Sequence, residues 1–273
     1  MKVLTSTSGS IKSFDNINLY YRKDIPVDQK AIVIIIHGFG EHLGRYEYVK
    51  DKLVKYGYGV IRLDNRGHGK SNGERGHIND FNDFARDVDV LIEFVRNENP
   101  NIPIFMLGHS MGGFISVLYG ILYKNKIDGQ ILSAAATITP TRAKGIKIKA
   151  LKLASKVFPK IPMKNPMLRH LLKNGEDELV LRSATLNFYI QFLSYGIEWI
   201  RGNFKSYEYP CLILHGSDDR EIKKDASEQL YSSISSKDKE IKIYDGLYHE
   251  MLKQKDRDMI LYDIHEWIEN RIR

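Results

Sequence analysis

The chain has a single cysteine among its 273 residues, which excludes an internal disulfide. Cys211 opens an apolar run typical of a strand, and we interpret it as a small buried side chain. The N-terminal residues also lack the sustained apolar segment of a signal peptide. Together these absences lead us to expect a cytoplasmic protein.

Long apolar runs are absent as well. The longest uninterrupted aliphatic run spans residues 31–36, which is far too short to cross a bilayer and typical of a buried strand. Only eight prolines and a hydrophobic fraction of 42% argue against a disordered chain. A chain of this length is compatible with one large α/β domain.

Acidic residues are missing from residues 141–173, a segment that carries ten lysines and arginines. Because the whole chain has a net charge of +7, its remaining residues are net negative, and the basic character belongs to this segment. A nucleic-acid-binding surface would interleave such charge with stacking aromatic rings, and Phe158 is the only aromatic residue here. We therefore expect no nucleic-acid partner.

The basic segment contains an amphipathic helical pattern. Its apolar positions recur at helical spacing and are surrounded by lysines; they are Ile146, Ala150, Leu153 and Val157. Two interpretations remain open. The apolar stripe packs on the rest of the protein and leaves the lysines in solvent, or the helix docks on an anionic membrane and gives the protein a peripheral membrane contact.

The middle of the chain carries a candidate nucleophile. Residues 102–107 are typical of a strand, and a helical pattern begins near Phe114. Between them, the sequence GHSMG at residues 108–112 matches the G-x-S-x-G spacing of a nucleophile elbow, with Ser110 at its centre. A serine in such a tight turn leaves no room for a Cβ two residues to either side, which explains both glycines. The pentapeptide alone is also compatible with a glycine-rich packing turn. The rest of the sequence must therefore decide between a nucleophile elbow and such a turn.

Strand-like and helix-like patterns alternate on both sides of this elbow. The strand-like runs are residues 31–36, 60–63, 102–107, 129–136, 211–214 and 241–244, preceded by a hairpin around Asp15 and Asn16. Alternation of this kind predicts a mostly parallel sheet with helices on both faces. It breaks in a basic, helix-patterned segment that contains four prolines. We expect an α/β core formed by residues 1–136 and 207–273 and a helical insert formed by residues 137–206.

A serine hydroxyl needs a base to take its proton, and the base needs an acid to orient it. In an elbow-containing sheet the acid and then the histidine follow the serine, each just after a late strand. His249 follows the last strand-like run, whereas His215 precedes the acid and His265 falls within the final helix. The acid is one of two adjacent residues, Asp218 and Asp219. We prefer Asp219 and interpret the other as a turn residue.

The oxyanion that forms on attack needs two hydrogen-bond donors fixed in place, and backbone N–H groups suit this role. Met111 follows the nucleophile and supplies one donor. The glycine-rich loop at residues 37–40 follows an early strand, and we assign the second donor to Phe39. The predicted oxyanion hole therefore joins two segments that are distant in the sequence.

Several loops contain histidines, which raises the question of a metal. These histidines lie in separate loops and lack the spacing of zinc ligands; they are His37, His42, His68 and His77. We expect no metal site. We interpret Glu41 and Arg66 as residues that brace the loops around the site.

Five motifs together carry a family resemblance: HGFGEH, DNRGHGKS, GHSMGG, GSDDR and YHE. The chain resembles the α/β-hydrolase superfamily, and within it the monoacylglycerol lipase and lysophospholipase group. The resemblance implies an α/β-hydrolase fold, a serine esterase that acts through an acyl-enzyme, and neither a metal nor an organic cofactor. It also implies that the acid is Asp219, and that a helical cap admits a small lipid ester with one acyl chain.

The chain departs from this group at two places. Glu250 follows the predicted base where the family often has an aliphatic residue, and the insert matches no motif of the family. The expected activity is that of a monoacylglycerol lipase. Lysophospholipase, general carboxylesterase and thioesterase activities on the same fold are the alternatives. A binding protein without catalysis would usually have lost a member of the triad, and here all three positions are filled.

Overall fold

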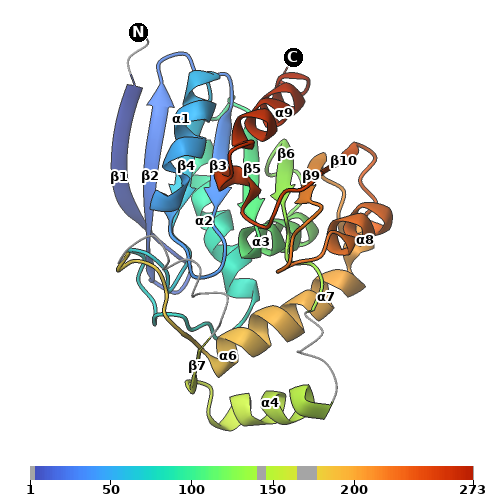
Figure 1. Cartoon of the computed structure of the whole chain (residues 1–273). Helices are drawn as coiled ribbons and strands as arrows, with labels where there is room; N and C mark the ends of the chain where they lie inside the picture. The colour runs from blue at the N-terminus through green and yellow to red at the C-terminus, as the bar shows by residue number, and fades with distance from the viewer. Residues whose placement is uncertain (1–3, 140–145, 165–176, 273) are drawn as a thin grey trace.

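An eight-stranded sheet forms the centre of the molecule (Figure 1). The computed structural model describes residues 4–139, 146–164 and 177–272. In spatial order the strands are β1 (Leu4–Lys12), β2 (Asn18–Pro26), β4 (Gly59–Leu63), β3 (Ile32–Ile36), β5 (Ile104–His109), β6 (Gly129–Ser133), β9 (Cys211–Gly216) and β10 (Lys239–Tyr244). The hairpin β1–β2 is antiparallel and pairs antiparallel with β4, whereas the neighbours from β4 to β10 are all parallel. The predicted mostly parallel sheet is confirmed.

Helices cover both faces of the sheet, as the alternation predicted. Ile32, Ile34 and Ile36 of β3 pack in a layer with α2 (Asn82–Glu98), α3 (Met111–Leu122) and α8 (Asp225–Ser233). Val33 and Ile35 point the other way, into a layer with α1 (Glu47–Lys55) and α9 (Arg257–Glu269). Successive strand side chains point to opposite faces, so a sheet covered on both sides requires a continuous aliphatic strand such as β3.

β6 ends earlier than the strand predicted over residues 129–136. Ala134 adopts a φ of 45°, which interrupts the extended backbone. The next residue lies against the elbow, where a Cβ on Gly113 would come within 2.6 Å of the Ala135 Cβ. The N–H of Ala136 then donates to the carbonyl of Ser110 at 3.0 Å. The chain therefore leaves the sheet early because it packs on the nucleophile turn, a contact that no local pattern reveals.

Between β6 and β9 the described part of the chain is mostly helical, while residues 140–145 and 165–176 of the predicted insert lie outside the described residues. The described elements are α4 (Ile146–Val157), the short pair β7 (Pro162–Met163) and β8 (Ala184–Thr185), α6 (Leu186–Tyr189), the π-helical η3 (Ile190–Gly196), α7 (Ile197–Gly202) and η4 (Phe204–Ser206). α6, η3 and α7 follow one another without a break, and this long helix crosses the lower end of the sheet in Figure 1, with α4 farther out. The arrowheads of the parallel strands point toward that end.

The first interpretation of the amphipathic helix is wrong for the members of its stripe whose side chains are described. Leu153 is 67% exposed and Val157 is 63% exposed, so this stripe does not pack on the protein. The buried face instead carries Ser155 and Lys152, whose Nζ lies 3.0 Å from an oxygen of Glu198 and 4.5 Å from the centre of the Tyr195 ring. The facing helix offers a carboxylate and an aromatic ring, and both contact Lys152 of α4.

None of the helices in the described ranges combines the length and the apolar composition of a membrane span.

Candidate active site

Ser110 occupies a strained turn between β5 and α3, with φ 54° and ψ −113°. Such backbone values are costly for a residue with a side chain and persist only where the surroundings impose them. The flanking glycines make the turn possible. A Cβ on Gly108 would lie 2.3 Å from the Gly112 carbonyl oxygen, and a Cβ on Gly112 would lie 2.0 Å from the Ile36 oxygen. The steric argument for both glycines is confirmed.

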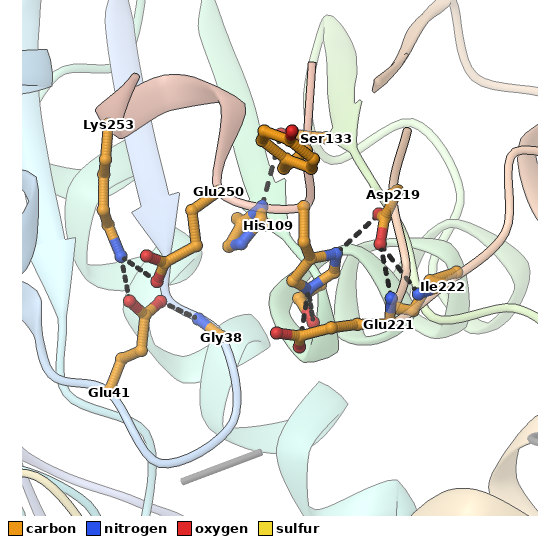
Figure 2. Close-up of polar contacts among 12 residues, drawn as sticks. Gly38, Glu41, His109, Ser133, Asp219, Glu221, Ile222, Glu250 and Lys253 are labelled. Carbon is orange, nitrogen blue, oxygen red and sulfur yellow. Dashed lines mark hydrogen bonds and ion pairs between the residues drawn. The ribbon is translucent and has the colours of Figure 1, made fainter. Parts of the chain in front are cut away.

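The turn presents the serine hydroxyl to a histidine from a distant loop. Nε2 of His249, in the loop after β10, lies 2.9 Å from Oγ of Ser110. Nδ1 of the same ring lies 2.7 Å from Oδ2 of Asp219, which follows β9. All three side chains are buried and form a continuous hydrogen-bonded chain, whose acid, Asp219, is labelled in Figure 2. The structure thus brings together the three predicted side chains from three separate loops.

Of the two candidate acids, only Asp219 contacts the histidine. Asp218 is exposed and its carboxylate accepts a hydrogen bond from Ser217 at 3.1 Å. The backbone N–H groups of Glu221 and Ile222 donate to Oδ1 of Asp219 at 2.8 and 2.9 Å. Burial opposes the charge of this carboxylate, but hydrogen bonds from His215 and His249 outweigh it and lower the pKa of Asp219.

His215 is a second histidine on the same acid, and the sequence analysis gave it no role. Its Nε2 lies 3.1 Å from Oδ2 of Asp219 and 2.8 Å from the carbonyl of Ile222. Its Nδ1 lies 2.7 Å from Oγ of Ser227. Since a carbonyl only accepts, Nε2 carries a proton and donates it toward Ile222 and the carboxylate of Asp219. His215 therefore helps to hold the carboxylate toward His249.

The electrostatic surroundings favour the charged form of His249. Burial lowers its pKa, but the hydrogen bond and charge of Asp219, followed by the charges of Glu221 and Glu250, raise it above the ordinary value. The ring of His109 packs 4.9 Å from that of His249. Burial and the neighbouring His249 charge lower the pKa of His109 to about 3, so this ring stays neutral at neutral pH.

The predicted oxyanion loop turns back on itself beside the elbow. Gly38 N–H donates to Oε2 of Glu41 at 3.1 Å, and the carbonyl of Gly40 accepts from Leu181 N–H of the insert at 3.0 Å. Met111 begins α3 directly after the nucleophile. Within the described ranges, the backbone N–H groups of Phe39 and Met111 have no hydrogen-bond acceptor. Both are therefore available to a ligand.

An ionic cluster connects this loop to the loop of the histidine. Glu41 is almost fully buried and accepts hydrogen bonds from Tyr46 at 2.8 Å, from Arg45 at 3.0 Å and from Lys253. Lys253 also donates to Oε1 of Glu250 at 3.0 Å, next to His249 in the chain (Figure 2). Despite burial, the charge of Lys253 and its neighbours lowers the pKa of Glu41 well below the usual range. The expected bracing role of Glu41 agrees with these contacts, whereas Lys253 gave no signal in the sequence.

The other predicted loop residues make separate contacts. Arg66 donates to both oxygens of Asp87, at 2.6 and 2.7 Å, and so fastens its loop to α2. His42 pairs with Asp177 at 2.8 Å, and His77 lies 2.9 Å from Oγ1 of Thr185. Among the described residues, no group of three metal-ligating side chains comes together. These histidines therefore connect loops of the core to the insert.

A family model described as serine aminopeptidase, S33, matches residues 27–256 of the chain. The chain belongs to this family of α/β hydrolases. The match includes the elbow, both later loops and the whole insert. Family membership and the fold agree with the resemblance found in the sequence motifs.

Two relatives of this S33 hydrolase carry lipase names. A monoacylglycerol lipase of Mycolicibacterium smegmatis is 30% identical, over 88% of this chain and 89% of its own length. A monoglyceride lipase of Rattus norvegicus is 33% identical, over 89% of this chain and 84% of its own length. The crystal structure of a monoacylglycerol lipase from Paleococcus ferrophilus superposes with a TM-score of 0.81 at 26% identity, covering 93% of this chain and 99% of that one. This hydrolase is thus similar to monoacylglycerol lipases in sequence and in fold.

Proposed function

We propose that this protein is a monoacylglycerol lipase that acts through an acyl-enzyme on Ser110. The hydrogen-bonded chain from Ser110 through His249 to Asp219 is the observation that carries the proposal. His249 takes the hydroxyl proton while Oγ attacks the ester carbonyl, and Asp219 stabilises the resulting imidazolium. His249 then returns the proton to the departing glycerol oxygen. A water molecule activated by the same ring releases the fatty acid.

In this proposal, the N–H groups of Phe39 and Met111 bind the oxyanion of each tetrahedral intermediate. Both lack a protein acceptor within the described residues and flank the nucleophile from two segments. Preorganised donors of this kind lower the barrier by about 3 kcal/mol each, because they need no reorientation as charge develops. The contact between Gly40 and Leu181 fixes the loop of Phe39 against the insert.

We further propose that residues 137–206 are a cap that shapes the acyl site over the core of residues 1–136 and 207–273. Aromatic side chains of the insert meet the oxyanion loop directly. The ring of Phe39 lies 5.0 Å from that of Phe188 and 5.7 Å from that of Tyr189. An apolar wall next to the nucleophile suits an acyl chain, and the names of the relatives support a lipid ester. Lysophospholipase, carboxylesterase and thioesterase activities are the alternatives within this mechanism.

The outward face of α4 supports peripheral contact with an anionic membrane. Leu153, Val157 and Phe158 are largely exposed, and exposed lysines such as Lys149 and Lys156 surround them. Apolar side chains that insert at the lipid boundary, next to lysines that meet anionic headgroups, are the two components of interfacial binding. Co-sedimentation with vesicles tests this: we expect binding that grows with anionic lipid and falls with salt. Binding indifferent to both would contradict it.

A fluorophosphonate probe and a panel of esters test the catalytic proposal. We expect the probe to label the wild-type protein and to leave the Ser110→Ala variant unlabelled. We expect turnover of monoacylglycerols to exceed that of lysophospholipids and acyl thioesters of the same chain length. A folded Ser110→Ala variant with wild-type turnover would refute the mechanism. Faster cleavage of the acyl thioester than of the monoacylglycerol would refute the proposed substrate class.

A further inference from the structure

A second carboxylate lies beside the serine–histidine pair and is not used in the mechanism above. Glu221 is two residues after Asp219, and its Oε2 lies 3.8 Å from Nε2 of His249. Its side chain is 23% exposed, so it borders both the buried histidine and the solvent. Figure 2 labels Glu221 near Asp219 and Ile222.

The distance between this carboxylate and the departing alcohol can be bounded from the position of His249. In the proposed mechanism Nε2 of His249 gives its proton to the leaving oxygen, so that oxygen comes within about 3 Å of Nε2. With Oε2 of Glu221 3.8 Å from the same nitrogen, the carboxylate and the leaving oxygen are separated by at most about 7 Å. In a 1-monoacylglycerol the hydroxyl groups are on the second and third carbons counted from the ester oxygen. A glycerol hydroxyl can therefore reach the carboxylate while its ester oxygen is at the histidine.

We propose that Glu221 is a specificity-determining residue that accepts a hydrogen bond from a hydroxyl of the leaving alcohol. The inference rests on the proposed ester hydrolysis and defines which esters it favours. An ionised carboxylate only accepts, so it selects leaving groups with hydroxyl or cationic groups near the ester. It repels a phosphate at the same place. The site therefore prefers glycerol esters over simple alkyl esters, and disfavours glycerol esters that carry a phosphate.

Glu221 also favours the charged form of His249 by its charge, and this second effect must be separated from the first. An effect through His249 changes the rate for every ester alike, because each reaction passes through the same imidazolium. Recognition of the alcohol changes kcat/KM for the recognised ester and therefore changes the ratio of kcat/KM values between esters. The ratio of kcat/KM values for esters that share one acyl chain therefore isolates recognition.

The experiment compares three esters of one fatty acid: the 1-monoacylglycerol, the methyl ester and the 1-acylglycerol 3-phosphate. For Glu221→Leu we expect kcat/KM on the monoacylglycerol to fall about tenfold relative to that on the methyl ester. The phosphorylated ester should improve relative to the methyl ester. Glu221→Gln keeps an acceptor but removes the charge, so it should recover part of the monoacylglycerol preference and retain the gain on the phosphorylated ester.

Glu228→Leu is the matched control, since it removes an exposed glutamate on the neighbouring helix α8. It should leave all three ratios unchanged. A Glu221→Leu variant that loses activity equally on all esters, or whose ratios equal those of the wild type, would overturn the inference alone. A wild-type protein inactive on both the methyl ester and the monoacylglycerol would overturn the proposed function together with it.

Discussion

The carboxyl edge of the sheet and the outer helix of the insert, α4, differ in which side chains they bury. At the edge, Asp219 is a buried charge that receives hydrogen bonds from two histidines and two backbone N–H groups. On α4, Leu153 and Val157 are apolar side chains left in solvent. A buried charge persists only where partners compensate for its lost hydration, and an exposed apolar patch leaves favourable burial unused. The buried charge at the edge thus has its partners within the protein, whereas Leu153 and Val157 of α4 leave apolar surface exposed.

The difference predicts how the two regions respond to substitution. Changes to the buried side chains at the edge should alter the reaction or the fold strongly, because Ser110, Asp219 and His249 are each held by a hydrogen bond. Changes on the outer face of α4 should leave both almost unaltered and change only what the protein attaches to.

Asp219→Asn should give the largest effect. An asparagine amide donates toward Nδ1 of His249 and selects the wrong tautomer, so we expect kcat on a short ester to fall about 10⁴-fold. Asp218→Asn, one residue earlier and exposed, should change kcat less than about twofold. Steady-state kinetics with circular dichroism as a folding control decide between them. Similar losses in both variants would contradict the assignment of the acid.

Gly112→Ala should prevent stable folding of the elbow. The added Cβ would lie 2.0 Å from the backbone oxygen of Ile36, and backbone of the central sheet cannot easily move away. We expect a loss of more than about 3 kcal/mol in the free energy of unfolding. Gly202→Ala, at the end of α7, meets no atom within 4 Å and should change stability by less than about 1 kcal/mol. Urea unfolding of both variants tests this pair, and equal midpoints would contradict the steric account.

Lys253→Met should lower kcat without changing the fold. The lysine joins Glu41, which anchors the oxyanion loop, to Glu250 beside the histidine. Without it the two loops lose their direct connection, and we expect kcat to fall about tenfold while KM changes little. Lys255→Met, an exposed lysine two residues on, is the control. If KM rises and kcat stays constant, Lys253 contacts substrate instead of positioning the loops.

The fold could be predicted from the sequence, and the predicted triad residues do meet in space. Both results depend on local patterns that a parallel sheet brings together. Strand alternation, the elbow glycines and loops that follow late strands are local patterns, and the topology of a parallel sheet brings those loops to one edge. Lys253, His215 and Glu221 were missed because their contacts join segments that only the fold brings together. Periodicity identified α4, but it could not reveal that Lys152 contacts Glu198 and Tyr195, which follow more than 40 residues later in the chain.

The pH dependence should show the raised pKa of His249. This ring must be neutral to accept the serine proton, so kcat/KM falls as the pH drops through its pKa. Because that pKa lies above the ordinary 6.5, activity should be lost at a higher pH than an unperturbed histidine would give. Glu250→Gln removes one of the charges that raise the pKa, and the acid limb should move to lower pH. A limb that stays in place or moves upward in this variant would contradict the electrostatic account.

Exposed apolar residues of α4 should give the smallest effect on the protein itself. In the Leu153→Ser and Val157→Ser double variant no packed side chain is lost, so the free energy of unfolding should change by less than about 0.5 kcal/mol. Turnover of a dispersed short ester should be unchanged for the same reason. Binding to anionic vesicles should fall several-fold, since these side chains supply the apolar part of the contact. Val27→Ser is the matched control. This exposed valine follows the C-terminal end of β2, at the end of the sheet away from the insert in Figure 1. Its replacement should leave vesicle binding intact. If the double variant unfolds more easily while Val27→Ser does not, the stripe packs on the protein after all, and the contrast between the two regions disappears.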